Sequence, residues 1–253
     1  MKKQNQRFHP FNIGKQWKKW MAVSCSHGDC IDADAMNAVL TFRDRFKPDT
    51  VIHLGDFVDM TAARSGAIRD TNSSDHARIV ADDLCAGIGF LQELAPQHVL
   101  YGNHEDRLFS LANSPNALLA HAATLVIQEI EEFARAKKIQ LYPYAIDSYA
   151  QLGDIKFSHG HMYNVAAIRD HAETLGDCVI GHLHRVGMEK ARNISYATGY
   201  CVGMLMEFMP NYAKGRRATL AWSQGFGYGY YSDTHTTVNL CERKRNTPWL
   251  LPL

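Results

Sequence analysis

Three short apolar runs alternate with longer segments of helical spacing in the first half of the chain, and this alternation constrains the fold more than any other feature. The runs WMAVS, TVIHL and HVLY have the length and apolar character of buried strands. Segments with helical spacing follow them at about 32–46, 74–94 and 116–136. Strands that alternate with helices form βαβ units, which require a parallel sheet. The first half is therefore predicted to be α/β with a largely parallel sheet.

The second half has a different pattern, because most of it consists of short apolar runs separated by turns. Strands are predicted at IQLYP, AQLGD, IKFS, CVI and TLAWS, and a hairpin within 226–243 is predicted to turn near Ser232 and Asp233. One helical segment, VAAIRDHAETLG, ends at Gly176, a residue type that often terminates helices. These elements predict a second, mixed sheet packed beside the first. We expect an N-terminal arm at 1–17 and a single domain at 18–253.

The composition is that of an ordinary globular protein. With 253 residues, of which 46% are hydrophobic, the chain is long enough for one large domain. Its formal net charge of +1 gives no global basic field of the kind that dominates non-specific nucleic-acid binding. No stretch approaches the roughly 20 apolar residues of a membrane span, and the polar first residues lack the apolar core of a signal peptide. The six cysteines have no regular spacing, so we expect a reducing, cytoplasmic location.

Metal-competent side chains directly follow five of the predicted strands. Each cluster alone has an ordinary explanation, since Gly-Asp is common in turns and a single histidine is usually a hydrogen-bonded core or surface residue. Loops at the carboxyl ends of neighbouring strands converge in an α/β sheet, however, so side chains placed there meet. Five clusters in such positions are hard to explain as turns. They are Cys25 with His27, Asp56 with Asp59, Asn103 with His104, His159 with His161, and His182 with His184.

The order of these clusters resembles a known family. The segments SCSHGD, GDFVD, GNHE, SHGH and GHLH are similar to the five motifs of the calcineurin-like metallophosphoesterases. The resemblance extends from about Val23 to Arg185. Four motifs match fully, whereas the first matches at His27 and departs at Cys25, where the family has an aspartate. The resemblance implies a four-layer αββα sandwich with two mixed β-sheets, and the two ends of the chain further resemble phage- or prophage-encoded members.

The resemblance also implies two divalent metal ions. Two metals about 3.5–4 Å apart, with a hydroxide between them, can attack a phosphoester in line, and they need a shared anion, for which Asp56 is the natural bridge. By similarity, the first metal is held by His27, Asp56, His184 and the residue at Cys25, and the second by Asp56, Asn103, His159 and His182. Such ligands suit Mn, Fe, Zn, Co or Ni and do not select among them. By the same similarity, His104 is expected to protonate the leaving oxygen or to stabilise developing charge. Asp59 is expected to accept a hydrogen bond from His104 and to fix its orientation.

Cys25 leaves three interpretations open. As a thiolate ligand it would shift the preference of the first metal toward Zn or Fe. As a small buried residue at a strand end it would leave that metal weakly bound, with Asp29 as an alternative carboxylate beyond the His-Gly turn. In the third interpretation the site is degenerate and the fold serves as a scaffold. We prefer a working metalloenzyme with Cys25 as a ligand, because a site without function has no reason to hold the other candidates.

Several further residues are weaker candidates. Arg64, Arg107 and Arg185 each follow a motif closely and could hold phosphate oxygens, although a surface role is as well supported. His161 is a candidate for either the surroundings of the metals or the substrate. His53, inside a predicted strand, is expected to be a hydrogen-bonded core residue. Tyr228, Tyr230 and Tyr231 are expected to pack on the sheet rather than to stack on bases.

The sequence therefore predicts a metal-dependent phosphoesterase acting on a phosphoester substrate. The compact spacing and the lack of a long inserted cap indicate an open site, which would admit a polymer or a generic diester. The leading prediction is a phosphodiesterase or nuclease-like hydrolase, with nucleic acid as one candidate partner. A phosphomonoesterase or phosphoprotein phosphatase is the runner-up, and a catalytically weak metal-binding scaffold for protein partners is the alternative that is not an enzyme.

Overall fold

The computed structural model describes residues 17–63, 80–208 and 217–252. The predicted arm at 1–17 lies outside the described residues apart from Trp17, and the division into an arm and a single domain stays a prediction. Within the described ranges, no helix is long and apolar enough to cross a membrane.

The first sheet has six strands and contains segments from both ends of the chain. Its strand order is β11-β10-β1-β2-β3-β4. Strands β1 to β4 are parallel to one another, whereas β10 is antiparallel to both β1 and β11. The strands are β1 (Lys18–Val23), β2 (Thr50–His53), β3 (His98–Leu100), β4 (Gln140–Tyr142), β10 (Gln224–Tyr231) and β11 (Asn239–Arg243). The predicted C-terminal hairpin is confirmed, but it extends the first sheet, because β10 pairs with β1 along Lys18 to Ala22.

The second sheet is mixed, as predicted, and has five strands in the order β5-β6-β7-β9-β8. Strands β6, β7 and β9 are parallel, and the outer strands β5 and β8 are antiparallel to their neighbours. The strands are β5 (Ala150–Leu152), β6 (Ile155–Ser158), β7 (Cys178–Ile180), β8 (Val186–Lys190) and β9 (Thr198–Val202).

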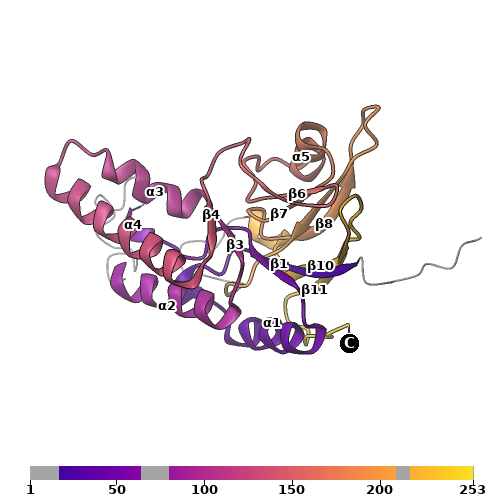
Figure 1. The fold of residues 1–253 in the computed structure, drawn as a ribbon, viewed down its shortest axis with the longest axis horizontal. Helices are drawn as coiled ribbons and strands as arrows, with labels where there is room; N and C mark the ends of the chain where they lie inside the picture. Colours follow the sequence, from indigo (N-terminus) through magenta and orange to yellow (C-terminus); the bar gives the residue numbers. More distant parts are fainter. Residues whose placement is uncertain (1–16, 64–79, 209–216, 253) are drawn as a thin grey trace, which may run out of the picture.

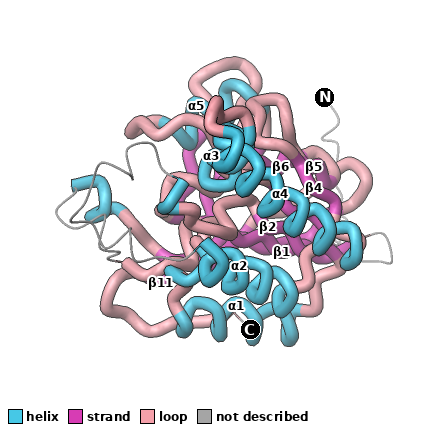
Figure 2. Tube along the Cα trace, turned by 90° about the vertical axis from the view of Figure 1, so that its left-hand side faces the viewer, coloured by secondary structure: helices cyan, strands magenta, loops and turns pink. Residues whose placement is uncertain are grey.

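Helices cover the outer faces of both sheets. They are α1 (Ala33–Phe46), α2 (Val80–Leu94), α3 (Asn103–Ala112), α4 (Ala117–Lys137) and α5 (Ala167–Leu175). Figure 1 shows α1 and α2 below the first sheet, α5 above the second sheet, and the paired helices α3 and α4 at one end. Figure 2 shows the same layers from the side of that helix pair. The arrangement confirms the four-layer αββα sandwich.

Strand β1 shows how the sequence specifies these layers. Successive side chains of a strand point to opposite faces of the sheet. Trp20 and Ala22 pack into the core between the two sheets, whereas Met21 and Val23 pack into the core beneath α1 and α2. All four are completely buried. An uninterrupted apolar strand is therefore required here, because both of its faces are covered.

One helix was not predicted, and two predicted elements differ in the structure. The segment Asn103–Ala112 forms a separate helix, α3, because Glu105 accepts a hydrogen bond from the backbone N–H of Gly102 and caps the first turn. The first three residues of the predicted strand TLAWS belong instead to a 3₁₀ helix, Arg217–Ala221, and the N–H of the following Trp222 donates to the carbonyl of Thr219. The helix predicted at 74–94 is observed from Val80, and its first residues lie outside the described ranges.

Candidate metal centre

The five clusters from the sequence meet at one end of the two sheets. His27 follows β1, Asp56 follows β2 and Asn103 follows β3, while His159 follows β6 and His182 follows β7. Three groups of these side chains place their donor atoms within 4.8 Å of one another. The groups are Cys25, His27, Asp56 and His184; Asp56, His159 and His182; and His27, Asp59 and His104. Asp56 is shared by the first two groups, as a bridging residue must be.

Asp56 is a buried anion surrounded by imidazoles. Its Oδ2 lies 3.3 Å from Nε2 of His159, 3.9 Å from Nε2 of His27 and 4.0 Å from Nε2 of His104. Burial alone would raise the pKa of Asp56, but these three imidazoles outweigh it and hold the pKa well below its usual value. The carboxylate is therefore ionised and can act as a shared ligand.

The second group has converging acceptor atoms that fit a cation. Nδ1 of His159 lies 2.7 Å from the carbonyl oxygen of Leu54, which can only accept, so Nδ1 carries the proton. Nε2 lies 3.2 Å from Oδ1 of Asn103 and 3.3 Å from Oδ2 of Asp56. Burial alone would lower the pKa of His159, but the charge of Asp56 and the hydrogen bond to it outweigh burial and raise this pKa, so Nε2 can hold a proton between these oxygens. A metal ion bound here would take the place of that proton between the same donor atoms. His182 completes this group from the loop after β7, and burial lowers its pKa to about 3, so its ring is neutral.

The first group contains two imidazoles, those of His27 and His184, that face each other. Nδ1 of His27 lies 3.0 Å from Oδ1 of Asp59, and its Nε2 faces Nε2 of His184 at 3.1 Å. Burial lowers the pKa of both imidazoles, with His104 contributing for His27 and His27 contributing for His184. Both rings are therefore neutral, which is the form that binds a metal.

Cys25 lies in the first group but in apolar surroundings. Its thiol is fully buried, lies 3.1 Å from the hydroxyl of Ser24, and packs against Met204 and Met206. Burial, followed by the charge of Asp56, raises its pKa well above the usual value of a thiol. The geometry is thus compatible with either a sulfur ligand or a packed neutral thiol. Asp29 is exposed and belongs to none of the three groups, so the structure gives no support to it as a substitute ligand.

Several of these residues have an unusual backbone conformation that aims them at the centre. Cys25, His27, Asp56, His182 and His184 all have φ between 54° and 62°, in the left-handed region. Such conformations are uncommon for residues with side chains and persist only where surrounding contacts hold them. The loops hold one another: the N–H of Cys25 donates to the carbonyl of Gly55 at 3.0 Å, and the N–H of His27 donates to that of Asp56 at 2.9 Å.

Gly102 is needed because the loops approach so closely. A Cβ atom at this position would lie 2.2 Å from Oδ1 of Asp56 and 2.6 Å from Cε1 of His159. No side chain fits there without displacing a candidate ligand. The glycine of the GNHE segment is therefore part of the geometry of the centre.

Two buried carboxylates support the loop after β2, and neither was identified from the sequence. Glu105 accepts hydrogen bonds from the backbone N–H groups of Asp56 at 3.0 Å and Val58 at 3.1 Å. Burial and the charge of Asp56 raise the pKa of Glu105 to about 7. Asp83 on α2 accepts from the N–H groups of Asp59 at 3.0 Å and Met60 at 2.7 Å. The position of Glu105 in GNHE was an available signal, whereas nothing local to the sequence marks Asp83.

His104 lies beside Asp59, but the contact differs from the one predicted. Its Nδ1 lies 2.6 Å from the backbone carbonyl of Asp59, whereas the Asp59 carboxylate is 3.4 Å away and lies closer to His27. Arg107 donates to the same carbonyl at 2.8 Å and to Nε2 of His104 at 3.1 Å. The shorter contact by which Asp59 fixes His104 is therefore to its main chain, while the nearby imidazoles of His104 and His27 hold the pKa of the Asp59 carboxyl below the usual range despite burial.

The other substrate candidates are placed differently. Arg107 lies at the centre, but the guanidinium of Arg185 donates to the carbonyl of Val165 at 2.9 Å and lies 3.9 Å from Glu189. Arg64 lies outside the described residues. His161 belongs to none of the three donor groups, and its ring stacks on Tyr144 with centroids 4.2 Å apart.

The predictions made for residues away from the centre are confirmed. His53 is fully buried, and its Nε2 lies 3.1 Å from the hydroxyl of Ser26. Tyr228 and Tyr230 pack against Phe46, with ring centroids 5.5 and 5.8 Å away. The hydroxyl of Tyr231 lies 2.8 Å from that of Thr50.

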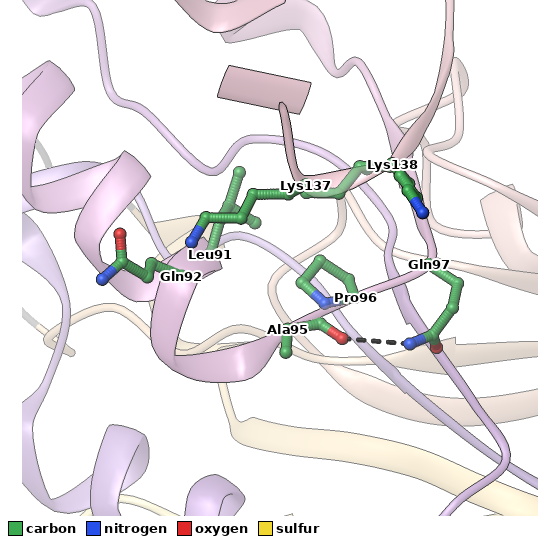
Figure 3. Close-up of a pocket in the computed structure, with 8 residues that line it drawn as sticks. Leu91, Gln92, Ala95, Pro96, Gln97, Lys137 and Lys138 are labelled. Carbon is green, nitrogen blue, oxygen red and sulfur yellow. Dashed lines mark hydrogen bonds between the residues drawn. The ribbon is translucent and has the colours of Figure 1, made fainter. Parts of the chain in front are cut away.

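A separate cavity of about 340 Å³ lies away from these loops, between the ends of α2 and α4 and the start of β3. Figure 3 shows two lysines, Lys137 and Lys138, over it, and the amide of Gln97 donating to the carbonyl of Ala95 at 3.2 Å. Its lining contains no histidine, cysteine or carboxylate, so it has no metal chemistry. The lining residues are Leu91, Gln92, Ala95, Pro96, Gln97, Lys137, Lys138 and Ile139.

Comparison with known proteins agrees with this arrangement. The chain is 26% identical to the Gene 54 protein of Mycobacterium phage L5 over 233 residues, which cover 83% of this chain and 87% of the phage protein. It is 27% identical to the Gene 54 protein of Mycobacterium phage D29 over 248 residues, covering 88% and 92%. The predicted likeness to phage-encoded proteins is thus confirmed.

Among solved structures, a dimetal phosphatase from Danio rerio matches with a TM-score of 0.44 and 13% identity, covering 88% of this chain and 95% of that one. The family model described as calcineurin-like phosphoesterase matches residues 19–193, which include all five clusters. The chain therefore belongs to the calcineurin-like phosphoesterase family.

Proposed function

We propose that this protein hydrolyses phosphodiesters with the help of two divalent metal ions. The observation that carries the proposal is the pair of donor groups that share the buried carboxylate of Asp56. We assign Cys25, His27, Asp56 and His184 to one ion, and Asp56, Asn103, His159 and His182 to the other. Nitrogen, oxygen and sulfur donors in these sets suit Mn, Fe, Zn, Co or Ni. When bound, the two ions would neutralise phosphoryl charge and lower the pKa of the attacking water.

The residues around the centre have the contacts needed for the remaining chemistry. The His104 side chain is 12% exposed, so it can meet a substrate that the buried Asp56 cannot reach directly. Its orientation is fixed by the main-chain carbonyl of Asp59, and its Nε2 accepts from Arg107. A phosphoryl oxygen would compete for the guanidinium, because Arg pairs strongly with phosphate. Nε2 of His104 is then free to take up a proton, because the charge of Asp56 and the Asp59 carboxylate outweigh burial and raise the pKa of His104. The protonated Nε2 can face the leaving oxygen and supply that proton.

The preference for a diester is supported by the charge beside the centre. Of the arginines and lysines that the structure describes, Arg107 alone has a hydrogen bond to a candidate catalytic residue. A phosphodiester carries one negative charge, whereas a phosphomonoester carries about −1.5 to −2 at neutral pH. Beyond the two ions, this one guanidinium is available for the phosphoryl oxygens, which suits the single charge of a diester better than the larger charge of a monoester. The six cysteines are not in disulfide bonds, which supports the cytoplasmic location that belongs to this proposal.

Hydrolysis with added Mn²⁺ tests the proposal. We expect bis-p-nitrophenyl phosphate and single-stranded DNA to be cleaved faster than p-nitrophenyl phosphate. Asp56→Asn should lower the rate by at least about 100-fold. The change removes the proposed shared ligand itself, which costs more than the loss of a residue that only hydrogen-bonds to a ligand. Asp44→Asn, at a 66% exposed side chain on α1, is the matched control and should leave the rate unchanged.

Other outcomes separate the remaining functions. Cleavage of the monoester alone would identify a phosphomonoesterase. Bound metal with no cleavage of any ester would identify a scaffold. An Asp56→Asn protein as active as the wild type would contradict the enzyme proposal altogether.

A further inference from the structure

A tryptophan lies beside the first donor group at the edge of the centre. The ring of Trp222 meets that of His184 edge to face, with centroids 4.7 Å apart. The backbone holds it there, since the N–H of Ser223 donates to the carbonyl of His184 at 2.9 Å and the N–H of Val186 donates to the hydroxyl of Ser223 at 2.8 Å. Trp222 is nevertheless partly exposed, and the adjacent Leu220 is 79% exposed. A fixed aromatic ring therefore reaches the surface next to a candidate ligand.

A second aromatic group lies beside the other donor group. Tyr144 meets His159 edge to face, with centroids 5.8 Å apart, and its ring also stacks on that of His161. Its hydroxyl donates to the carbonyl of Gly160 at 3.4 Å. Both Tyr144 and His161 are partly exposed. Nε2 of His161 is itself buried and has no hydrogen-bond partner among the described residues. A buried polar atom of this kind is costly unless a ligand satisfies it.

These rings lie at the two ends of a continuous row of contacts. Trp222 contacts His184, whose Nε2 is 3.1 Å from that of His27. His27 lies 3.9 Å from Oδ2 of Asp56, and the same oxygen lies 3.3 Å from His159, which contacts Tyr144. A phosphate bound over Asp56 would therefore have an aromatic ring beside each of the two donor groups.

We propose that Trp222 and Tyr144 are base-binding subsites on the two sides of the scissile phosphate, with His161 as a hydrogen-bonding group of the Tyr144 subsite. This inference rests on the proposed diesterase function and names its substrate class, a single-stranded nucleic acid. Aromatic side chains bind successive bases of a single strand by stacking, with little dependence on sequence. A diester has two substituents, so a ring on each side matches a dinucleotide step, whereas a phosphomonoester would use only one. Bases in a duplex are already stacked, which makes a single strand the better ligand.

Dinucleotides with and without bases test the inference. The probes are thymidylyl-thymidine, its analogue with tetrahydrofuran in place of both bases, the two analogues that keep one base, and uridylyl-uridine to distinguish RNA from DNA. We expect the wild type to cleave thymidylyl-thymidine with a kcat/KM about tenfold or more above that of the base-free analogue. Trp222→Leu should abolish the advantage given by one base, and Tyr144→Leu the advantage given by the other.

Controls keep the outcomes separate. Trp222→Phe and Tyr144→Phe retain a ring and should keep most of the advantage, and they remain informative if a leucine variant does not fold. Tyr196→Leu, at an 83% exposed residue between β8 and β9, should change nothing. Equal cleavage of base-bearing and base-free diesters by the wild type would overturn the subsites but leave the diesterase intact. Variants that lose equal activity on base-bearing and base-free diesters would also overturn the subsites and leave the diesterase intact. If the wild type cleaved no diester, the proposed function itself would be overturned.

Discussion

The Nε2 atoms of His27 and His184 face each other at 3.1 Å in the buried centre, although one side chain follows β1 and the other comes from the loop after β7. Both imidazoles are neutral, because burial lowers the pKa of each. Neutral imidazoles so placed can share a cation. The pairing joins loops of the two sheets, so an ion bound there would link both halves of the sandwich.

Metal ions should therefore stabilise the fold. At a free metal concentration one hundred times the dissociation constant, binding at one site adds about 2.7 kcal/mol to the free energy of unfolding. For a chain of this size that corresponds to a rise in Tm of about 5–10 °C. We expect Mn²⁺ or Zn²⁺ added to chelator-treated protein to produce this rise in a thermal melt. His184→Ala should reduce it, whereas His121→Ala, at an exposed residue of α4, should not. A melting temperature indifferent to metal would contradict the assignment.

Cys25 gives a prediction in which metal content and stability respond differently. If its sulfur is a ligand, the wild type and Cys25→Asp should bind two ions per chain and Cys25→Ala fewer. The sulfur packs against the fully buried Met204 and Met206, so Cys25→Asp puts a carboxyl group into apolar surroundings. We expect the metal-free Cys25→Asp protein to lose about 1–3 kcal/mol of stability, which bound metal should restore. Metal analysis and denaturant unfolding measure the two effects. Equal binding of the same metal by all three proteins would show that Cys25 is not a ligand.

Gly102 should be sensitive to the smallest possible side chain. In Gly102→Ala the new methyl group would lie 2.2 Å from Oδ1 of Asp56, so the carboxylate must move. We expect hydrolysis to fall by about 100-fold, because a displacement near 1 Å has effects of this size on catalysis. The matched control is Gly89→Ala on α2, where a Cβ atom meets nothing within 4 Å. That change should leave activity intact and stabilise the helix by up to about 1 kcal/mol. Similar activities of the two variants would show that the close approach at Gly102 is unimportant.

The sequence predicted the centre better than its surroundings. His27, Asp56, Asn103, His159 and His182 all directly follow strands, and the carboxyl ends of parallel strands meet whatever the rest of the fold does. Their convergence could therefore be inferred before their distances were known. The sheet that receives the C-terminal hairpin could not be inferred in this way. A period of two in the sequence shows that a strand has two faces, but it does not show which strand lies beside it.

The residues that the sequence missed act over long separations. Asp83 accepts from the N–H groups of Asp59 and Met60 across a separation of more than twenty positions. Trp222 reaches His184 because the chain of TLAWS forms the end of a 3₁₀ helix, Arg217–Ala221, and the two residues after it, and not a strand. Its apolar and β-branched residues favour a strand locally, but the backbone of Ser223 is bonded to the loop of His184. Tertiary contacts decided both cases.

His53 should make stability depend on pH. Its imidazole is fully buried, and burial lowers the pKa of His53 from 6.5 to about 3. Because the folded form binds a proton less readily than the unfolded chain, the contribution of this group is complete above about pH 6.5 and is lost as the pH falls from 6.5 toward 3. Between pH 7.5 and pH 5 the loss from this residue is about 2 kcal/mol.

The variant His53→Gln isolates that contribution, because glutamine keeps a polar group near the hydroxyl of Ser26 and does not titrate. We expect the variant to be less stable at pH 7.5 but to lose about 2 kcal/mol less than the wild type on acidification to pH 5. Urea unfolding of metal-free protein at both pH values measures the difference, so that proton competition for metal ions does not contribute. The same loss in both proteins would place the acid sensitivity in the other buried imidazoles, of which His182 and His184 also have lowered pKa values.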